Sequence, residues 1–361
     1  MNGHHNGASK PANSEIVADP AWFPECFDAR RNEFLFVATD RHELSAQTFL
    51  DARWDRKGAA HVRLNANAIT LPGAGERRPE IGIVWHSAFC CSTLLAKALD
   101  RPGANLSLCE PQLLVDIAQA RRTKLLSEGG VSEVAQIALR LLSRPFAPGE
   151  SVIVKPSPAA NNLLRDTASD SAGPMLFLFS DCRSFIISIV RLGEDGRRYV
   201  RQLFLALLAE GPTQAQWPPA KLLSMSDLEL AALVWHMQIA EFRRSWAKLP
   251  PGGAASLDCD AFLASPKETL VRLDRFFSLG IAEPQLEETA TGPLFRRNAK
   301  TGEEAWDAAR RREQHARIAL EIEDDLKRIV AESYELCPAT PRGLPLPNPI
   351  IPVDKRYSPE T

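Results

Sequence analysis

Hydrophobic positions in the first half of the chain form short continuous runs that alternate with amphipathic stretches. The apolar runs cover residues 81–85 (IGIVW), 106–108, 151–154 (SVIV) and 175–179 (MLFLF). Runs of this length, rich in β-branched and aromatic residues, are typical of buried parallel strands. Helical patterns follow them at 92–100, 111–119, 131–143 and 183–192. This alternation predicts an α/β fold with a central parallel sheet and helices on both faces.

The regions on either side of this block differ in pattern. A strand is expected at 32–37 and a helix at 43–54, whereas long helical patterns cover 227–249, 266–279 and 302–333. The C-terminal half is therefore expected to be mostly helical. Residues 1–18 are rich in polar and small residues and are expected to be disordered. We predict a single domain over 19–336, followed by a proline-rich, extended tail over 337–361.

Composition and charge narrow the class of protein. Of the 361 residues, 45% are hydrophobic and 24% are charged, and the formal net charge is -2. Such a chain carries no general basic field, which argues against a nucleic-acid partner. It also contains no apolar run of the ~18 residues that a membrane helix needs. The start of the chain does not resemble a secretory signal.

The cysteines point to a reducing compartment. Seven cysteines are present, and none of them forms a CxxC pair. An odd number within apparent strands and helices favours a reduced, cytoplasmic protein over a disulfide scaffold. The adjacent residues Cys90 and Cys91 form either a redox pair or two small buried thiols.

The strand–loop–helix over residues 85–99 is the most informative local pattern. A helix that begins directly after a parallel strand offers unpaired N–H groups and a positive dipole end, which suit a phosphate group. Ser92 and Thr93 would add two hydroxyl donors at the first turn, or they would merely cap the helix. No lysine precedes Ser92, so the standard Walker pattern of magnesium-dependent nucleotide hydrolases is missing.

Three stretches together resemble a known family. Residues 89–95 (FCCSTLL) are similar to the 5′-phosphosulfate loop of sulfotransferases, and 179–188 (FSDCRSFIIS) are similar to that family's stretch for the nucleotide 3′-phosphate. Residues 258–266 (DCDAFLASP), with the leucine-rich helix ending at Gly280, resemble a third family stretch in the same order. The resemblance covers roughly residues 80–300. It implies a three-layer P-loop fold and sulfuryl transfer from 3′-phosphoadenosine 5′-phosphosulfate to a hydroxyl or amine, without a metal.

The resemblance also implies which residues bind the donor. Five loop residues would hold the 5′-phosphosulfate: Phe89, Cys90, Cys91, Ser92 and Thr93. Ser188 and Arg183 would bind the 3′-phosphate. Arg297 and Lys300 resemble the segment that closes over it, or they form a solvated basic turn.

This sequence departs from the family pattern at three of these positions. Phe89 replaces the basic residue before the loop, and Cys91 replaces a loop glycine. Ser180 replaces the arginine of the 3′-phosphate stretch, so that Arg183 or Arg191 would have to stand in for it. Because a residue with a Cβ tolerates positive φ poorly, Cys91 is the least expected of these changes. The departures fit a divergent branch of the family or a relative that has lost activity.

Three further residues are candidates for the chemistry. Lys155 ends a predicted strand and resembles the family lysine that stabilises the leaving phosphosulfate, although an exposed strand-end lysine is the alternative. Glu110 follows another strand and resembles the glutamate base of several family members. Its alternative is an acidic residue at a helix N-terminus, with Pro111 at the first helical position. His86, at the loop entry, is the second candidate base or a structural histidine.

Two other functions remain open on sequence grounds. A P-loop kinase or hydrolase would need the missing loop lysine, and a non-catalytic nucleotide-binding or scaffold protein would fit the replaced loop residues. The acceptor would be a small molecule, a glycan or a peptide, and neither a membrane partner nor an oligomeric state is indicated. The basic run Arg310–Arg312 is expected to be a solvated helix face.

Overall fold

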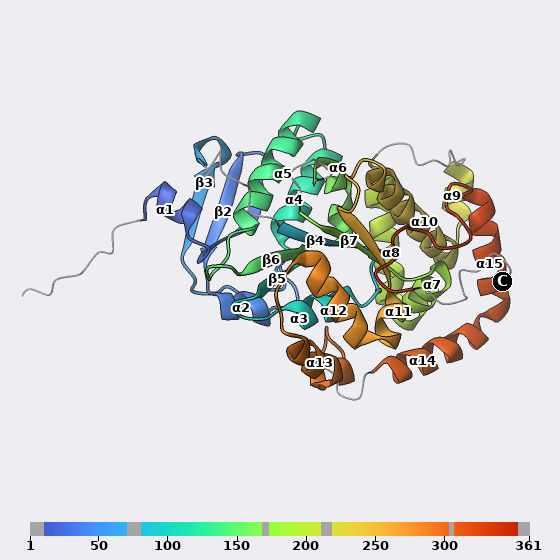
Figure 1. Cartoon of the computed structure of the whole chain (residues 1–361). Coiled ribbons are helices and arrows are strands. Elements are labelled where there is room, and N and C mark those ends of the chain that lie inside the picture. The colour runs from blue at the N-terminus through green and yellow to red at the C-terminus, as the bar shows by residue number, and fades with distance from the viewer. Residues whose placement is uncertain (1–10, 71–80, 168–172, 211–218, 303–306, 353–361) are drawn as a thin grey trace, which may run out of the picture.

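The computed structural model describes residues 11–70, 81–167, 173–210, 219–302 and 307–352. Its centre is a five-stranded sheet with the order β5-β6-β4-β7-β8, in which all neighbouring strands run parallel (Figure 1). The strands are β4 (Ile81–His86), β5 (Asn105–Cys109), β6 (Ser151–Lys155), β7 (Met175–Phe179) and β8 (Ala254–Asp258). The expected α/β class with a central parallel sheet is confirmed.

Alternation of side chains along the strands builds two separate cores. In β4, Ile83 and Trp85 belong to one hydrophobic cluster, whereas Val84 belongs to the other. In β7, Phe177 belongs to the first cluster and Leu178 belongs to the second. Because successive side chains of a strand point to opposite faces, a fully apolar strand can bury both of its faces only when helices cover both.

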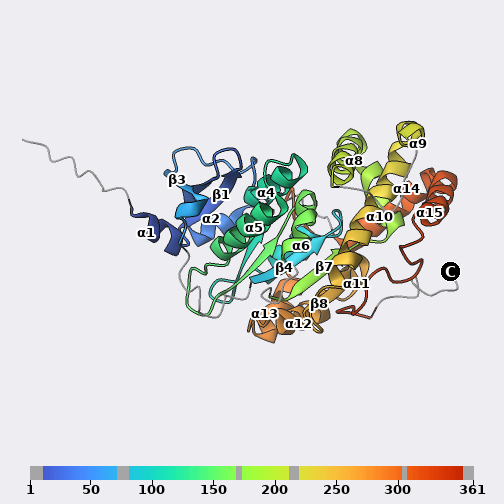
Figure 2. The ribbon, with the colours of Figure 1, turned by 90° about the horizontal axis from the view of Figure 1, so that it is seen from above.

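Helices do cover both faces, as Figure 2 shows. One face packs against α4 (Gln112–Arg122), α5 (Glu128–Leu142), α7 (Cys182–Arg191), α8 (Gly193–Leu208) and α10 (Asp227–Trp246). The other face packs against α3 (Ser92–Leu99), α12 (Pro266–Phe277) and α13 (Glu283–Thr291). The remaining elements after β6 are η2 (Pro158–Leu163), α6 (Leu164–Thr167), α9 (Pro219–Ser224), α11 (Cys259–Ala264), η3 (Pro293–Arg296), α14 (Ala308–Glu321) and α15 (Glu323–Leu336).

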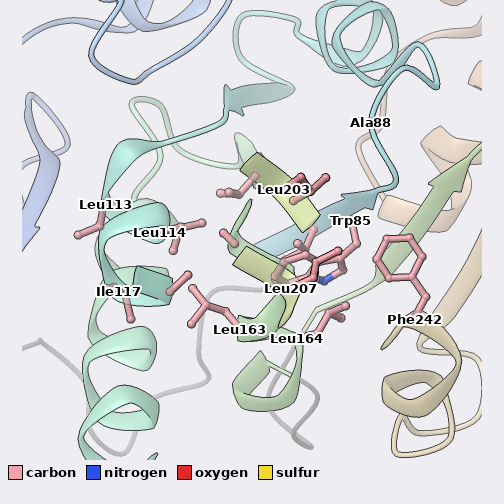
Figure 3. Packing of buried hydrophobic residues seen from close by; sticks show 14 of the residues in the cluster. Trp85, Ala88, Leu113, Leu114, Ile117, Leu163, Leu164, Leu203, Leu207 and Phe242 are labelled. Atoms are coloured by element: carbon pink, nitrogen blue, oxygen red, sulfur yellow. The ribbon is translucent and has the colours of Figure 1, made fainter. Parts of the chain in front are cut away.

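The larger core lies under the end of β4 that leads to the candidate site. Figure 3 shows Trp85 among Leu164, Leu207 and Phe242, which come from α6, α8 and α10. Trp85 is almost completely buried. This packing fixes the last residues of β4 and therefore the start of the loop that follows.

A small antiparallel sheet precedes the central one. It consists of β1 (Trp22–Asp28), β2 (Glu33–Ala38) and β3 (His61–Asn65), with α1 (Asn13–Ala18), α2 (Arg41–Ala46) and η1 (Ala66–Ala68) beside it. The N–H of Leu50 donates to the Cys109 carbonyl, and the N–H of Gln112 donates to the Leu50 carbonyl. These two bonds fasten the segment after α2 to the end of β5.

Several sequence expectations need correction. The helix expected at 43–54 ends at Ala46, because the segment that follows is bent and its Leu50 is hydrogen-bonded to the end of β5. The helix expected at 302–333 is divided at Ile322 into α14 and α15, and its residues 303–306 lie outside the described part. The strand β8 was not expected, because Leu257 is its only large apolar residue.

The two ends of the chain are also more ordered than expected. Residues 13–18 form α1 with Ile16 and Val17 buried, while residues 1–10 lie outside the described part. In the tail, Leu346 and Ile351 are buried, and the N–H of Ile350 donates to the Ser256 carbonyl of β8. Residues 353–361 are not described. Within the described ranges, no helix is both long and apolar enough to cross a membrane.

One partly buried arginine holds α1 in place. The Arg144 guanidinium donates to the carbonyls of Ile16, Val17 and Asp19 at 2.9–3.0 Å and to the carbonyl of Trp22 at 2.7 Å. Burial lowers the pKa of Arg144 to about 10. The side chain therefore links the C-terminal end of α1 to the first residue of β1.

We expect the Arg144→Met substitution to lower the free energy of unfolding by about 2–4 kcal/mol, because buried carbonyls would lose their donors. Chemical denaturation measures this change. Arg312→Met, at an exposed position of α14, is the control and should change stability by less than about 0.5 kcal/mol. Equal effects of the two substitutions would show that the Arg144 bonds contribute nothing.

Candidate functional site

The carboxyl ends of the parallel strands meet at one edge of the central sheet. His86 ends β4 and Lys155 ends β6, and Glu110 follows β5 directly. The strand order reverses at β4, because the connection through α3 passes over β6 to β5, whereas the chain after β6 returns across β4 to β7. Open parallel sheets bind ligands at such a reversal point.

The loop between β4 and α3 adopts an unusual backbone without any glycine. Ala88, Phe89 and Cys91 have φ values of 65°, 51° and 61°. The loop is held by the Ser87 N–H, which donates to the Leu178 carbonyl at 3.1 Å. A left-handed conformation costs a residue with a Cβ roughly 1–2 kcal/mol. Strain of this kind persists where the surroundings fix the backbone, and it is concentrated at functional sites.

Ser92 and Thr93 do not cap α3. The residue at the cap position is Cys91, and it makes no side-chain capping bond. The Ser92 hydroxyl pairs with His86 Nδ1 at 3.3 Å. The buried Thr93 hydroxyl has no hydrogen-bond partner among the described residues. The capping alternative for these two residues is therefore wrong, and Thr93 keeps a donor for another group.

Glu110, Lys155 and His86 form one buried cluster. Lys155 Nζ lies 2.5 Å from Glu110 Oε1, and His86 Nε2 lies 3.9 Å from the same oxygen. The side chain of Lys155 is 1% exposed, that of His86 3% and that of Glu110 12%. The exposed-lysine alternative is wrong. Glu110 precedes the N-cap Pro111 of α4 and pairs with Lys155, so it does not serve as an acid in the first turn of that helix.

The geometry also fixes the protonation of His86. The Ala88 N–H donates to His86 Nδ1 at 3.2 Å, so Nδ1 is an acceptor and the ring proton lies on Nε2, toward Glu110. Burial lowers the pKa of His86 well below its usual value, and the charges of Lys155 and Lys300 lower it further. His86 is therefore neutral at pH 7 and orients the Ser92 hydroxyl.

Lys300 joins this cluster to a neighbouring cavity. It is an exposed residue, and its ammonium lies 5.8 Å from the Phe49 ring and 5.5 Å from the Phe89 ring. Lys155 Nζ lies 5.8 Å from the same Phe49 ring. Desolvation of the Lys300 ammonium lowers its pKa, and Glu110 opposes this change. Two lysines thus approach one aromatic ring from different elements.

A cavity of about 320 Å³ opens beside the N-terminus of α3, and we call it the α3 cavity. Four of its lining residues are basic: Arg191, Arg297, Lys300 and Arg311. Its other polar lining residues are Thr93, Ser188, Asn298, Thr301, Asp307 and His315, and its larger apolar ones are Phe89, Leu94, Leu192, Leu263 and Phe295. Among the described lining residues only Asp307 carries a carboxylate, and Asp260 pairs with Arg311 from outside the lining, so positive charge remains in excess and the cavity suits an anion.

The structure brings only some of the expected donor-binding residues to this cavity. Those that line it are Phe89, Cys91, Thr93, Ser188, Arg297 and Lys300. Cys90 is buried elsewhere, with its thiol donating to the Leu178 carbonyl at 3.5 Å, and Ser92 is engaged by His86. The catalytic candidates Glu110, Lys155 and His86 are not among the lining residues either.

Arg183 does not reach the α3 cavity. It lies at the exposed N-terminal turn of α7, and its charge helps Lys327 to lower the pKa of Glu323. Arg191, eight residues further along α7, lines the cavity instead. The sequence position of Arg183 fits a family stretch, but the helix directs it away from the loop. Of the two arginines that could stand in for the missing family residue, only Arg191 lines the cavity.

Arg311 is the functional candidate that the sequence analysis missed. It was expected on a solvated face, yet it is only 7% exposed and lies 2.5 Å from Asp260. Its Nη2 atom is buried without a hydrogen-bond partner among the described residues. The spacing Arg311, His315, Ile318 places one stripe of α14 toward the interior, and this period is the signal that could have identified it.

Comparisons with known proteins give a limited result. No family model matches the chain, and no curated protein matches it. One similar solved structure is a sulfotransferase domain from the curacin biosynthetic pathway, 16% identical, with 69% of this chain and 99% of that chain covered and a TM-score of 0.41. Another is a sulfotransferase domain from the Synechococcus PCC 7002 olefin synthase. It is 15% identical, the match covers 73% of this chain and 96% of that chain, and the TM-score is 0.40. At this level of likeness, residue roles in this chain rest on its own geometry.

The buried ion pair gives a direct stability test. Glu110→Gln would leave the Lys155 ammonium buried without a counter-charge, and we expect the free energy of unfolding to fall by about 2–4 kcal/mol. Adding Lys155→Met should recover at least about 1 kcal/mol, because the unpaired charge is then removed. Chemical denaturation of both single variants and the double variant measures the coupling.

The matched control is the exposed pair Lys327–Glu323, which has the same 2.5 Å separation. Glu323→Gln should leave the free energy of unfolding nearly unchanged, since water screens exposed pairs. Strictly additive effects at Glu110 and Lys155 would contradict the placement of their ion pair in a low-dielectric site.

Proposed function

We propose that this chain is a sulfotransferase-like enzyme that transfers a sulfuryl group from 3′-phosphoadenosine 5′-phosphosulfate to a hydroxyl or amine acceptor. The observation that carries the proposal is the α3 cavity, in which four cations surround the start of a helix that follows a parallel strand. Such a site attracts a phosphorylated ligand through both fixed charge and helix dipole.

The cavity has distinct places for the parts of such a donor. The Thr93 hydroxyl and the first N–H groups of α3 would bind the 5′-phosphosulfate. Arg297 and Arg191 would bind the 3′-phosphate beside Ser188. The apolar walls formed by Leu192 and Phe295 would pack against the nucleoside.

Glu110 would accept the proton of the acceptor. Within the buried cluster it has the most exposed side chain, so it is the member best able to meet a second substrate. The acceptor oxygen or nitrogen forms a bond to sulfur, and the bond from sulfur to the phosphate oxygen breaks. The acceptor proton moves to Glu110, which Lys155 holds in position, and Lys300 would stabilise the charge on the departing phosphate.

The two rival functions make different demands on this site. A kinase or hydrolase would need a loop lysine before Ser92, and Cys91 occupies that position. A non-catalytic nucleotide-binding protein would need the α3 cavity alone. The acceptor, which would be a small molecule, a glycan or a peptide, would reach Glu110 from outside the cavity.

Donor binding gives the first test. Adenosine 3′,5′-bisphosphate should bind the wild-type protein in calorimetric titration more tightly than ATP with magnesium does. Thr93→Val should weaken binding by roughly 10- to 100-fold, because one hydrogen bond to a charged group contributes about 1.5–3 kcal/mol. Ser92→Ala is the matched control, since the Ser92 hydroxyl is already engaged by His86, and it should have little effect.

Three results would count against the donor assignment. Unchanged affinity in Thr93→Val would remove the loop from the site. Preference for ATP with magnesium would favour the kinase or hydrolase, and failure of both nucleotides to bind would overturn the donor site itself.

The role of Glu110 gives a separate test in the same assay. Glu110→Gln should reduce sulfuryl transfer from labelled donor by about 10²–10⁴-fold, the usual contribution of general base catalysis. Its affinity for adenosine 3′,5′-bisphosphate should change little, because Glu110 does not line the α3 cavity. The rate is measured well below the thermal midpoint of the variant, after a screen of hydroxyl and amine acceptors with wild type. Normal turnover would show that Glu110 is not the base.

A further inference from the structure

Two cysteines from distant parts of the chain meet in the wall of the α3 cavity. Cys91 is the half-buried N-cap residue of α3 and lines the cavity, and Cys259 is the fully buried first residue of α11. The side chains of Cys91 and Cys259 interact with each other. The sequence had suggested the adjacent pair Cys90–Cys91, but the Cys90 thiol is turned away toward the Leu178 carbonyl.

The surroundings favour a negative charge on Cys91. Besides the interaction with Cys259, the charges of Arg311 and Lys300 lower the pKa of Cys91, while burial and Asp260 oppose them. The pKa of Cys259 is raised well above its usual value, first by its interaction with Cys91 and then by burial. Because Cys91 lines the basic cavity at the N-terminus of α3, whereas Cys259 is completely buried, Cys91 is the member of the pair expected to ionise.

Arg311 provides an independent sign that a negative group belongs here. Its buried Nη2 has no hydrogen-bond partner among the described residues, and its side chain lines the same cavity as Cys91. The other titratable groups that line this cavity are Arg191, Arg297, Asp307 and His315. Reactive cysteines occupy electropositive, partly exposed sites of this kind.

We propose that Cys91 is a peroxide-reactive nucleophile and that Cys259 is its resolving partner. The Cys91 thiolate attacks one oxygen of a peroxide: a sulfur–oxygen bond forms, the oxygen–oxygen bond breaks, and the hydroxide released is protonated to water. The Cys259 sulfur then attacks Cys91, so that a disulfide forms and the hydroxyl leaves as water with the Cys259 proton. Two thiols and one hydrogen peroxide thus give one disulfide and two waters.

Two other half-buried cysteines serve as controls for the effect of solvent accessibility on thiol reactivity. Cys26 and Cys337 are half-buried like Cys91, but burial raises the pKa of each to about 11. If exposure alone decided reactivity, these three thiols would react at similar rates. If the charges around Cys91 decide it, Cys91 should react at least about 10-fold faster at pH 7, because its thiolate fraction is larger.

The experiment treats the reduced full chain with hydrogen peroxide at pH 7, blocks remaining thiols and maps the peptides by mass spectrometry. A Cys91–Cys259 linkage that forms before Cys26 or Cys337 is oxidised is the expected result. Cys259→Ser should stop the reaction at sulfenic or sulfinic acid on Cys91. Cys337→Ser should leave the linkage unchanged.

The charge requirement is tested in the same way. Arg311→Gln should slow oxidation of Cys91 at pH 7, and the difference from wild type should shrink at higher pH, where the thiol ionises without help. Lys300→Gln, at an exposed residue, gives the same test if Arg311→Gln does not fold. Oxidation of Cys91 no faster than that of Cys26 and Cys337, or a linkage to Cys90 instead of Cys259, would overturn the proposal.

Discussion

Five strands run parallel in the central sheet, and this common direction decides where polar groups can accumulate. The strand interiors are apolar on both faces and are covered by helices, so charged residues can follow the strands only where these end. Because all five ends lie at one edge, Lys155 and Glu110 meet as neighbours although 45 residues separate them in sequence. The common direction of the strands therefore determines where the candidate site lies, whichever side chains occupy it.

The loop at this edge combines a strained backbone with side chains that form part of the cavity wall. Its backbone must turn sharply from β4 into α3, and three residues with side chains adopt positive φ to do so. Glycine would make the turn with less strain, but it would also remove the Cys91 sulfur and the Phe89 ring from the α3 cavity. The side chains that replace the expected glycine and basic residue thus contribute to the cavity wall. The positive charge is supplied instead by Lys300 and Arg311, from segments far along the chain.

Sequence patterns predicted the sheet and the buried cluster well, since both depend on local signals. Apolar runs marked four of the five central strands, and a polar residue directly after such a run identified Glu110 and Lys155. The orientation of residues on helices was harder to predict. Arg183 faces away from the cavity, and Arg311 faces into it, because packing of α7 and α14 sets the rotation of each helix. The contact between Cys91 and Cys259 depends on how α11 lies beside α3, which no local pattern encodes.

A crystal structure of the wild-type protein with adenosine 3′,5′-bisphosphate would test the central claim most directly. The account predicts that the nucleotide occupies the α3 cavity, with one phosphate bonded to the Thr93 hydroxyl and the N-terminus of α3. The second phosphate should lie against Arg297 and Arg191. A nucleotide bound elsewhere, with the α3 cavity left empty at saturating concentration, would contradict the account.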